Sequence, residues 1–164
     1  MRTLLLVTCG GSAMLLAGCG YSTQRPFTQD VQSVHVEMFH THDFRRDLEF
    51  RLTEAVVKRI EMDTNYRIAT RREADTVLSG ELVEVRQNTL GQDFRTDLPR
   101  ETSAAYIISF RWKDLRSGKI LVERERFPYV ATYIPPVGET FFDSAVRGLD
   151  GVAEQLVESM ESPW

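Results

Sequence analysis

The chain has 164 residues and a formal net charge of −4, with 42% hydrophobic and 27% charged residues. Its mild acidity and the lack of any dense basic run give no reason to expect nucleic acid as a partner. Beyond the first residues, no apolar run is long enough to cross a bilayer, which takes about 20 residues. Most of the chain is therefore predicted to be a water-soluble folded domain.

The first eighteen residues have the layout of an export signal. Arg2 supplies a positive charge, and the apolar run Leu4–Leu16 is too short to span a membrane comfortably. The closing segment Leu16-Ala17-Gly18-Cys19 resembles the lipobox of bacterial lipoproteins, in which the cysteine thiol accepts a diacylglyceryl group. We therefore expect cleavage after residue 18 and lipidation of Cys19. The alternative is an ordinary signal peptide followed by an accidental cysteine.

Cleavage at this point leaves 164 − 18 = 146 residues, the size of one domain with a proper core. Loss of Arg2 changes the net charge from −4 to −5. Because Cys9 lies within the signal, the folded part is expected to contain no disulfide and no thiol chemistry. Acyl chains on Cys19 would hold it on a membrane, since stable anchoring takes about two chains. By resemblance to well-studied lipoproteins, Gly20 at the next position implies sorting to the outer membrane.

These boundaries divide the chain into a signal peptide at 1–18, a lipidated N-terminus and tether at 19–30, and a single domain at 31–164. The polar tether from Gly20 to Gln29 reaches about 35 Å at full extension. The domain is therefore expected to work close to a membrane surface.

Four elements are predicted in the first half of the domain. Val34, Val36 and Met38 alternate with polar residues, which indicates a half-buried strand. A helix should follow, with Asp43 as a cap. A short strand is predicted at 66–69 and a longer one at 76–87, with a bulge or close packing at its glycine. The apolar stripe of the helix is predicted to consist of Phe44, Leu48, Leu52, Ala55, Val56 and Ile60.

The second half is predicted to contain an antiparallel pair of strands and a closing helix. Residues 88–102, with a glycine, a proline and several charges, are predicted to be a hairpin excursion outside the core. Alternation over 104–113 indicates the clearest strand, and a tight turn leads to a partner strand over 120–127. Pro128 marks an edge or a bulge. The last helix is predicted over 139–160, with a buried stripe of Phe142, Ala145, Leu149, Val152, Ala153, Leu156 and Met160.

Gly148 and Gly151 lower the helix propensity of that last segment. Flush packing against another element would explain them. With two amphipathic helices to cover and short connections between the middle strands, we predict an α+β fold. It would be a two-layer sandwich, with both helices packed on one face of a mostly antiparallel or mixed sheet of about four to five strands.

No motif for catalysis or cofactor binding is present, so we expect neither an enzyme nor a cofactor. His40 and His42 have a spacing that would allow a metal site, but a polar strand end and loop is the preferred explanation. Glu81 and Glu84 are three residues apart on a predicted strand. They should therefore face opposite sides and not share acid–base chemistry.

Basic side chains in two loops would suit the binding of an anionic ligand. Arg95 and Arg100 lie in the predicted excursion, and Arg116 and Lys119 lie in the tight turn. A guanidinium group can bind a phosphate through two parallel hydrogen bonds. All four are candidates for binding a phosphorylated glycolipid, although the two loops should lie at opposite ends of the sheet.

Five short motifs occur in a characteristic order and spacing along the chain after the signal. These are Cys19-Gly20-Tyr21, Val34–Phe39, Leu48–Ala55, Ala74–Gly80 and Ala153–Leu156. Together they resemble the LptE family of lipopolysaccharide-assembly lipoproteins, and the resemblance covers nearly the whole chain after the signal.

The resemblance implies two helices on a mostly four-stranded sheet and a non-catalytic role. It implies a lipoprotein on the periplasmic side of the outer membrane that plugs the LptD β-barrel, helps it assemble and binds lipopolysaccharide. Basic loop residues act in that binding, but the lysine that the family has before its last helix is absent, and Val137-Gly138-Glu139 stands there. An alternative from another class is a lipoprotein that activates a cell-wall enzyme. A third, a metal-dependent enzyme, would use His40 and His42.

Overall fold

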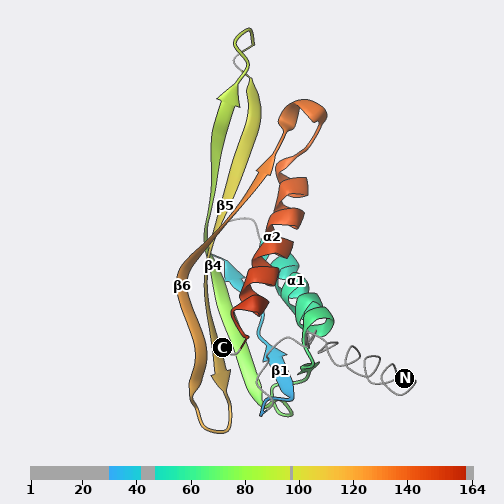
Figure 1. The fold of residues 1–164 in the computed structure, drawn as a ribbon, viewed down its shortest axis with the longest axis vertical. Helices are drawn as coiled ribbons and strands as arrows, with labels where there is room; N and C mark the ends of the chain where they lie inside the picture. The colour runs from blue at the N-terminus through green and yellow to red at the C-terminus, as the bar shows by residue number, and fades with distance from the viewer. Residues whose placement is uncertain (1–29, 42–46, 97, 162–164) are drawn as a thin grey trace, which may run out of the picture.

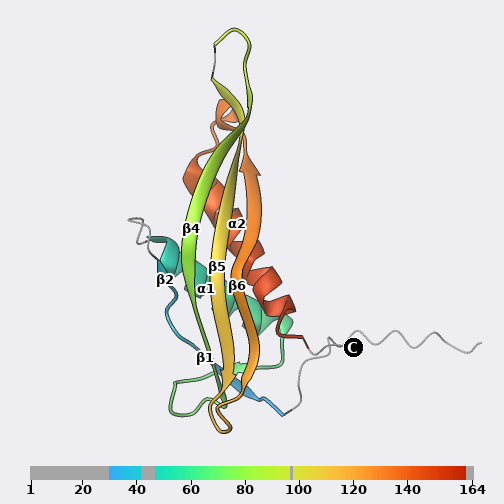
Figure 2. The same ribbon diagram turned by 90° about the vertical axis from the view of Figure 1, so that its left-hand side faces the viewer.

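The computed structural model describes residues 30–41, 47–96 and 98–161 of the chain. The lipidation candidate Cys19, the proposed cap Asp43 and the histidine His42 lie outside these residues. The described part forms one long twisted sheet with two helices on one of its faces (Figures 1 and 2). This is the predicted α+β sandwich. No helix within it is both long enough and apolar enough to cross a membrane.

The sheet has six strands, one more than the upper limit of the prediction. Its main path runs β3-β1-β4-β5-β6, where β1 is Ser33–Val36 and β3 is Arg67–Ile68. These two are parallel to each other, and β1 is parallel to β4 (Thr76–Gln92). The additional strand is β2, His40–Thr41, which also pairs with β4. A strand of two residues is too short to show a hydrophobic period.

The antiparallel part of the sheet is longer than the sequence pattern predicts. The strand β4 continues to Gln92, and β5 covers Pro99–Asp114. The predicted hairpin excursion over 88–102 is confirmed as the outer part of this hairpin, but most of it continues the two strands, and the turn lies between Gln92 and Pro99. The edge strand β6, Ile120–Tyr133, also continues beyond Pro128, which pairs with Ile107.

The two helices agree closely with their predicted ranges. The first, α1, covers Asp47–Asp63 and buries Leu48, Leu52, Val56 and Ile60. The second, α2, covers Phe141–Glu158 and begins with a capping box between Thr140 and Asp143. The predicted buried position of Phe142 is wrong, because its side chain is 55% exposed. The adjacent Phe141 is partly buried against the core instead.

Glycines let α2 lie flush on the sheet, as predicted. A Cβ atom at Gly148 would overlap the ring of Tyr106 in β5, and one at Gly151 would overlap the end of Tyr129 in β6. In β4, Gly80 is likewise a close-packing point, since a Cβ there would lie 2.5 Å from Cε1 of Phe39. The short 3-10 turn η1, Pro135–Val137, joins β6 to α2.

Irregularities in the strand register decide which side chains share the uncovered face of the sheet. Between Leu82 and Glu84 the register of β4 shifts by one residue, so that Glu81 lies opposite Ser109 and Glu84 lies opposite Ile107. Because Ser109 and Ile107 are two residues apart on β5, both glutamates lie on the same face. The prediction that they face opposite sides is wrong, since it assumes an unbroken alternation.

Candidate functional site

The β4–β5 hairpin projects beyond the first turn of α2 at one end of the molecule (Figure 1). One carboxylate organises its tip. Oδ1 of Asp93 accepts hydrogen bonds from the backbone N–H groups of Arg95 at 2.9 Å and Thr96 at 3.3 Å. The bond from Arg95 is the largest cause that holds the pKa of Asp93 below its usual value. The backbone N–H of Asp93 donates to the carbonyl of Leu98 at 3.0 Å, so the turn is closed from both sides.

Two of the predicted basic residues lie on this tip. Both Arg95 and Arg100 are exposed. The Nε atom of Arg100 lies 3.5 Å from Oδ2 of Asp93, with the arginine side chain 66% exposed. Among the described residues, Arg95 forms no ion pair within 4.0 Å. Exposed pairs of this kind contribute little, so both guanidinium groups keep donors available for a phosphate.

The other two basic residues lie at the opposite end of the sheet, on the turn between β5 and β6. There Arg116 donates a hydrogen bond from Nη2 to Oδ1 of Asp75. The structure therefore separates Arg95 and Arg100 from Arg116 and Lys119, as expected. The 17 residues of β4 lie between the two groups. At roughly 3.3 Å for each residue, that separation is about 50 Å.

The hairpin tip is also unusually apolar for an exposed turn. Phe94 is 100% exposed, Leu98 62% and Leu90 56%. Sequence reasoning recognised the basic residues here and missed the apolar ones, because the turn contains no periodic pattern. The signal available was the occurrence of large apolar residues within a stretch otherwise made of charged and turn-forming residues.

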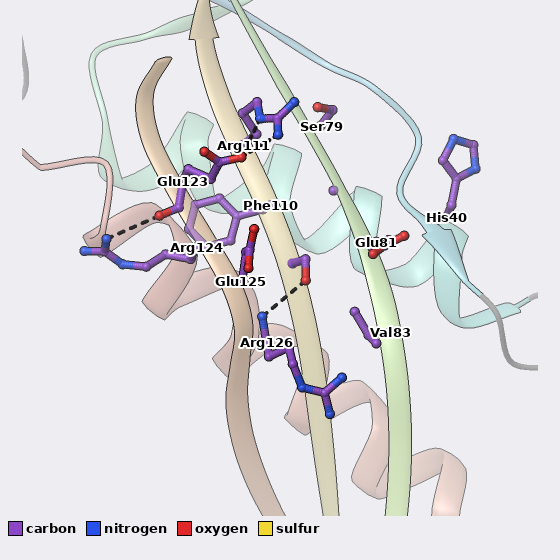
Figure 3. A pocket seen from close by; sticks show the side chains of 12 residues that line it. His40, Ser79, Glu81, Val83, Phe110, Arg111, Glu123, Arg124, Glu125 and Arg126 are labelled. Atoms are coloured by element: carbon purple, nitrogen blue, oxygen red, sulfur yellow. Dashed lines mark hydrogen bonds and ion pairs between the residues drawn. The ribbon is translucent and has the colours of Figure 1, made fainter.

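A second candidate site is an open groove of about 520 Å³ on the sheet face opposite the helices (Figure 3). It lies where β4 and β6 both depart from regular register. In β6 the irregularity puts Arg126 at φ 51°, and its backbone N–H donates to Oγ of Ser109. Sequence reasoning did not predict this groove, because bulges break the alternation from which faces are predicted.

Two of the arginines that line the groove are paired with carboxylates. Nη2 of Arg111 lies 2.5 Å from Oε1 of Glu123, which also lines the groove, and Nη2 of Arg126 lies 3.7 Å from Oε2 of Glu84 on the adjacent part of β4. The groove is therefore not a concentrated anion site. His40 lines one side of it, but no cluster of metal-ligating side chains occurs within the described residues.

A family model described as lipopolysaccharide-assembly matches residues 31–161. The chain belongs to the LptE family. This confirms the resemblance given by the sequence motifs, and with it the assignment to lipopolysaccharide assembly and to outer-membrane lipoproteins. LptE is a non-catalytic family, which agrees with the prediction that the chain is not an enzyme. No curated protein matches this chain by sequence.

Solved structures share the fold at low sequence identity. A hypothetical protein of Chlamydia trachomatis has a TM-score of 0.53 at 10% identity, covering 79% of this chain and 98% of its own. A protein of Xanthomonas campestris has a TM-score of 0.53 at 11% identity, covering 83% and 86%. An uncharacterized lipoprotein B of Nitrosomonas europaea has a TM-score of 0.50 at 10% identity, covering 77% and 82%. At such identities the likeness shows the fold alone.

Proposed function

We propose that this LptE-family chain is an outer-membrane lipoprotein, acylated at Cys19 and facing the periplasm, that plugs and helps assemble a lipopolysaccharide-export barrel of the LptD type. In the same proposal it binds lipopolysaccharide during insertion into the outer leaflet. The observation that carries this is the match of residues 31–161 to the lipopolysaccharide-assembly family. The elongated shape of the described domain supports a role as a plug, because a long, narrow sheet fits a lumen better than a spherical domain does.

The geometry favours the hairpin tip as the lipopolysaccharide-binding end. Arg95 and Arg100 lie there within one turn, whereas Arg116 at the other end is engaged with Asp75. Lys119 lies on the same turn as Arg116, whose partner Asp75 also accepts a hydrogen bond from the backbone of Ser33 near the start of the domain. We therefore assign lipopolysaccharide binding to Arg95 and Arg100, and keep Lys119 as the comparison residue.

Purification from solubilised outer membrane tests the barrel partner. The tagged full chain should recover a large outer-membrane barrel, and its depletion should lower the lipopolysaccharide of the outer leaflet. Recovery of a cell-wall synthase or hydrolase, without a lipopolysaccharide defect, would favour the alternative of an enzyme activator.

A direct binding assay tests whether lipopolysaccharide binds at the hairpin tip. The double variant R95E/R100E should bind lipopolysaccharide at least tenfold more weakly than the unchanged chain, which corresponds to about 1.4 kcal/mol or more. The control K119E, which reverses one charge instead of two, should change the affinity little. Equal weakening by both variants would contradict the assignment of binding to the hairpin tip.

A further inference from the structure

The hairpin tip displays two chemistries side by side. Phe94 is fully exposed, and Leu90 at the end of β4 and Leu98 in the turn before β5 are each more than half exposed. The cation Arg95 follows Phe94 directly. We propose that these three apolar side chains contact the acyl chains of a bound lipopolysaccharide molecule while Arg95 and Arg100 hold its phosphates. The inference rests on the proposed function and extends it from the charged to the apolar part of the ligand.

Complementarity of chemistry supports this occupant. A phosphorylated glycolipid carries its negative charge directly beside its acyl chains, and the tip carries its positive charge directly beside its apolar side chains. Asp93 holds the first part of the turn in place without any ligand, because it accepts hydrogen bonds from the backbone N–H groups of Arg95 and Thr96. A prearranged site lowers the entropy that binding would otherwise lose.

The chain's own N-terminal tether is too short to cover the tip. The described part begins beside Asp75, which accepts hydrogen bonds from the backbone N–H groups of Gln32 and Ser33. That residue adjoins the start of β4, and the tip lies about 50 Å away along the strand. A tether of residues 20–29 spans about 35 Å. The apolar tip therefore needs an occupant other than this segment.

A protein partner explains the tip alone less well than a lipid does. With Phe94 fully exposed and the two leucines each more than half exposed, the three side chains present roughly 400 Å². A stable protein interface buries about 800 Å² on each partner. The acyl chains of a lipid need no such area, because their affinity comes from a few methylene groups leaving water.

The test compares two forms of the ligand on the purified full chain, kept soluble by an amphipathic polymer. One is complete lipopolysaccharide, and the other is O-deacylated lipopolysaccharide, which keeps its phosphates and sugars. The unchanged chain should bind the complete form at least tenfold more tightly. The triple variant L90S/F94S/L98S should lose this preference and bind both forms alike. The control M62S removes a side chain that is 67% exposed on α1 and should keep the preference.

Three other outcomes would contradict the proposal, each in a different way. An unchanged preference in the triple variant would overturn the acyl-chain contact and leave lipopolysaccharide binding intact. Equal affinity of the unchanged chain for phosphatidylglycerol vesicles, lost in the triple variant, would overturn it in favour of insertion into any bilayer. Failure of the unchanged chain to bind either form would overturn the proposed function as well.

Discussion

Asp75 connects three separate segments at the end of the sheet from which the N-terminal tether leaves. Its Oδ2 accepts a hydrogen bond from Oγ of Ser33 at 2.8 Å and from the backbone of Gln32 and Ser33, while Arg116 approaches Oδ1. The hydrogen bond from Ser33 is the largest cause that lowers the pKa of Asp75, opposed by burial of the carboxylate. The charged form of Asp75 is therefore favoured by folding.

This predicts a pH-dependent contribution to stability. A carboxyl group whose pKa is lower in the folded chain stabilises it above the unfolded pKa, about 3.9. That contribution is lost as the pH falls through the folded value. The variant D75N should lower the free energy of unfolding by about 2 kcal/mol at pH 7 and by much less at pH 2.5. Urea unfolding at the two pH values measures this; an equal deficit at both would contradict it. The exposed control E73Q should have little effect.

Arg126 adopts a backbone conformation that suits glycine better than arginine, with φ 51°. A left-handed conformation costs a non-glycine residue about 1 kcal/mol. The ion pair that R126G would remove, to Glu84 at 3.7 Å, is exposed and contributes little. We expect R126G to leave stability unchanged or raise it by up to about 1 kcal/mol. In contrast, R124G on the same strand should destabilise by about 0.5 to 1 kcal/mol. Thermal unfolding of both variants distinguishes the two, and a clear loss in R126G would refute the argument.

At the scale of elements, the close contact between α2 and the sheet depends on Gly148. In an unpacked helix, glycine-to-alanine substitution stabilises by about 1 kcal/mol. Here the new methyl group would overlap the ring of Tyr106, which is 0% exposed and has no room to move. We expect G148A to destabilise by about 1 to 3 kcal/mol, as overpacking does. In β4, G91A has nothing within 4 Å of the new Cβ and serves as the matched control. Chemical denaturation measures both, and a stabilised G148A would refute close packing.

The elements that cover the core could be predicted from the sequence, and those outside it could not. Helices α1 and α2 follow from stripes that the structure buries, such as Leu48 and Leu149. The distal half of the β4–β5 hairpin has no helix over it, so residues such as Asn88 and Thr89 show no apolar period although they pair with Ser103 and Thr102. Hydrophobic periodicity arises because one face of an element is buried, so a strand with no buried face shows no such periodicity.

The candidate site was predictable to the same extent. Guanidinium chemistry makes Arg95, Arg100 and Arg116 candidates without any structure, and only the fold separates the first two from the third. That Glu81 and Glu84 lie on the same face of the sheet was not predictable. A register shift of one residue moves every side chain beyond it to the opposite face. The groove on that face depends on two such shifts.

At the scale of the whole molecule, stability and the proposed ligand site lie in different places. The core cluster combines side chains of both helices with side chains of the strands that the helices cover. None of the described residues between 90 and 101 is buried. Gly148 and Phe94 thus belong to regions that should respond independently to substitution.

Replacing residues 90–101 with Asn-Gly tests this separation. Thr89 and Thr102 are paired across the strands, and Asn-Gly favours the two-residue turn that would join them. Because no core side chain is removed, the free energy of unfolding should change by no more than about 1 kcal/mol, whereas lipopolysaccharide binding should fall at least tenfold. The variant G148A should show the converse, with lower stability and unchanged binding by the folded fraction. Circular dichroism with urea titration, together with a binding assay on both variants, gives the comparison. Retained binding by the shortened chain would mean that the ligand site lies elsewhere, and the open groove beside Arg126 would be the next place to examine.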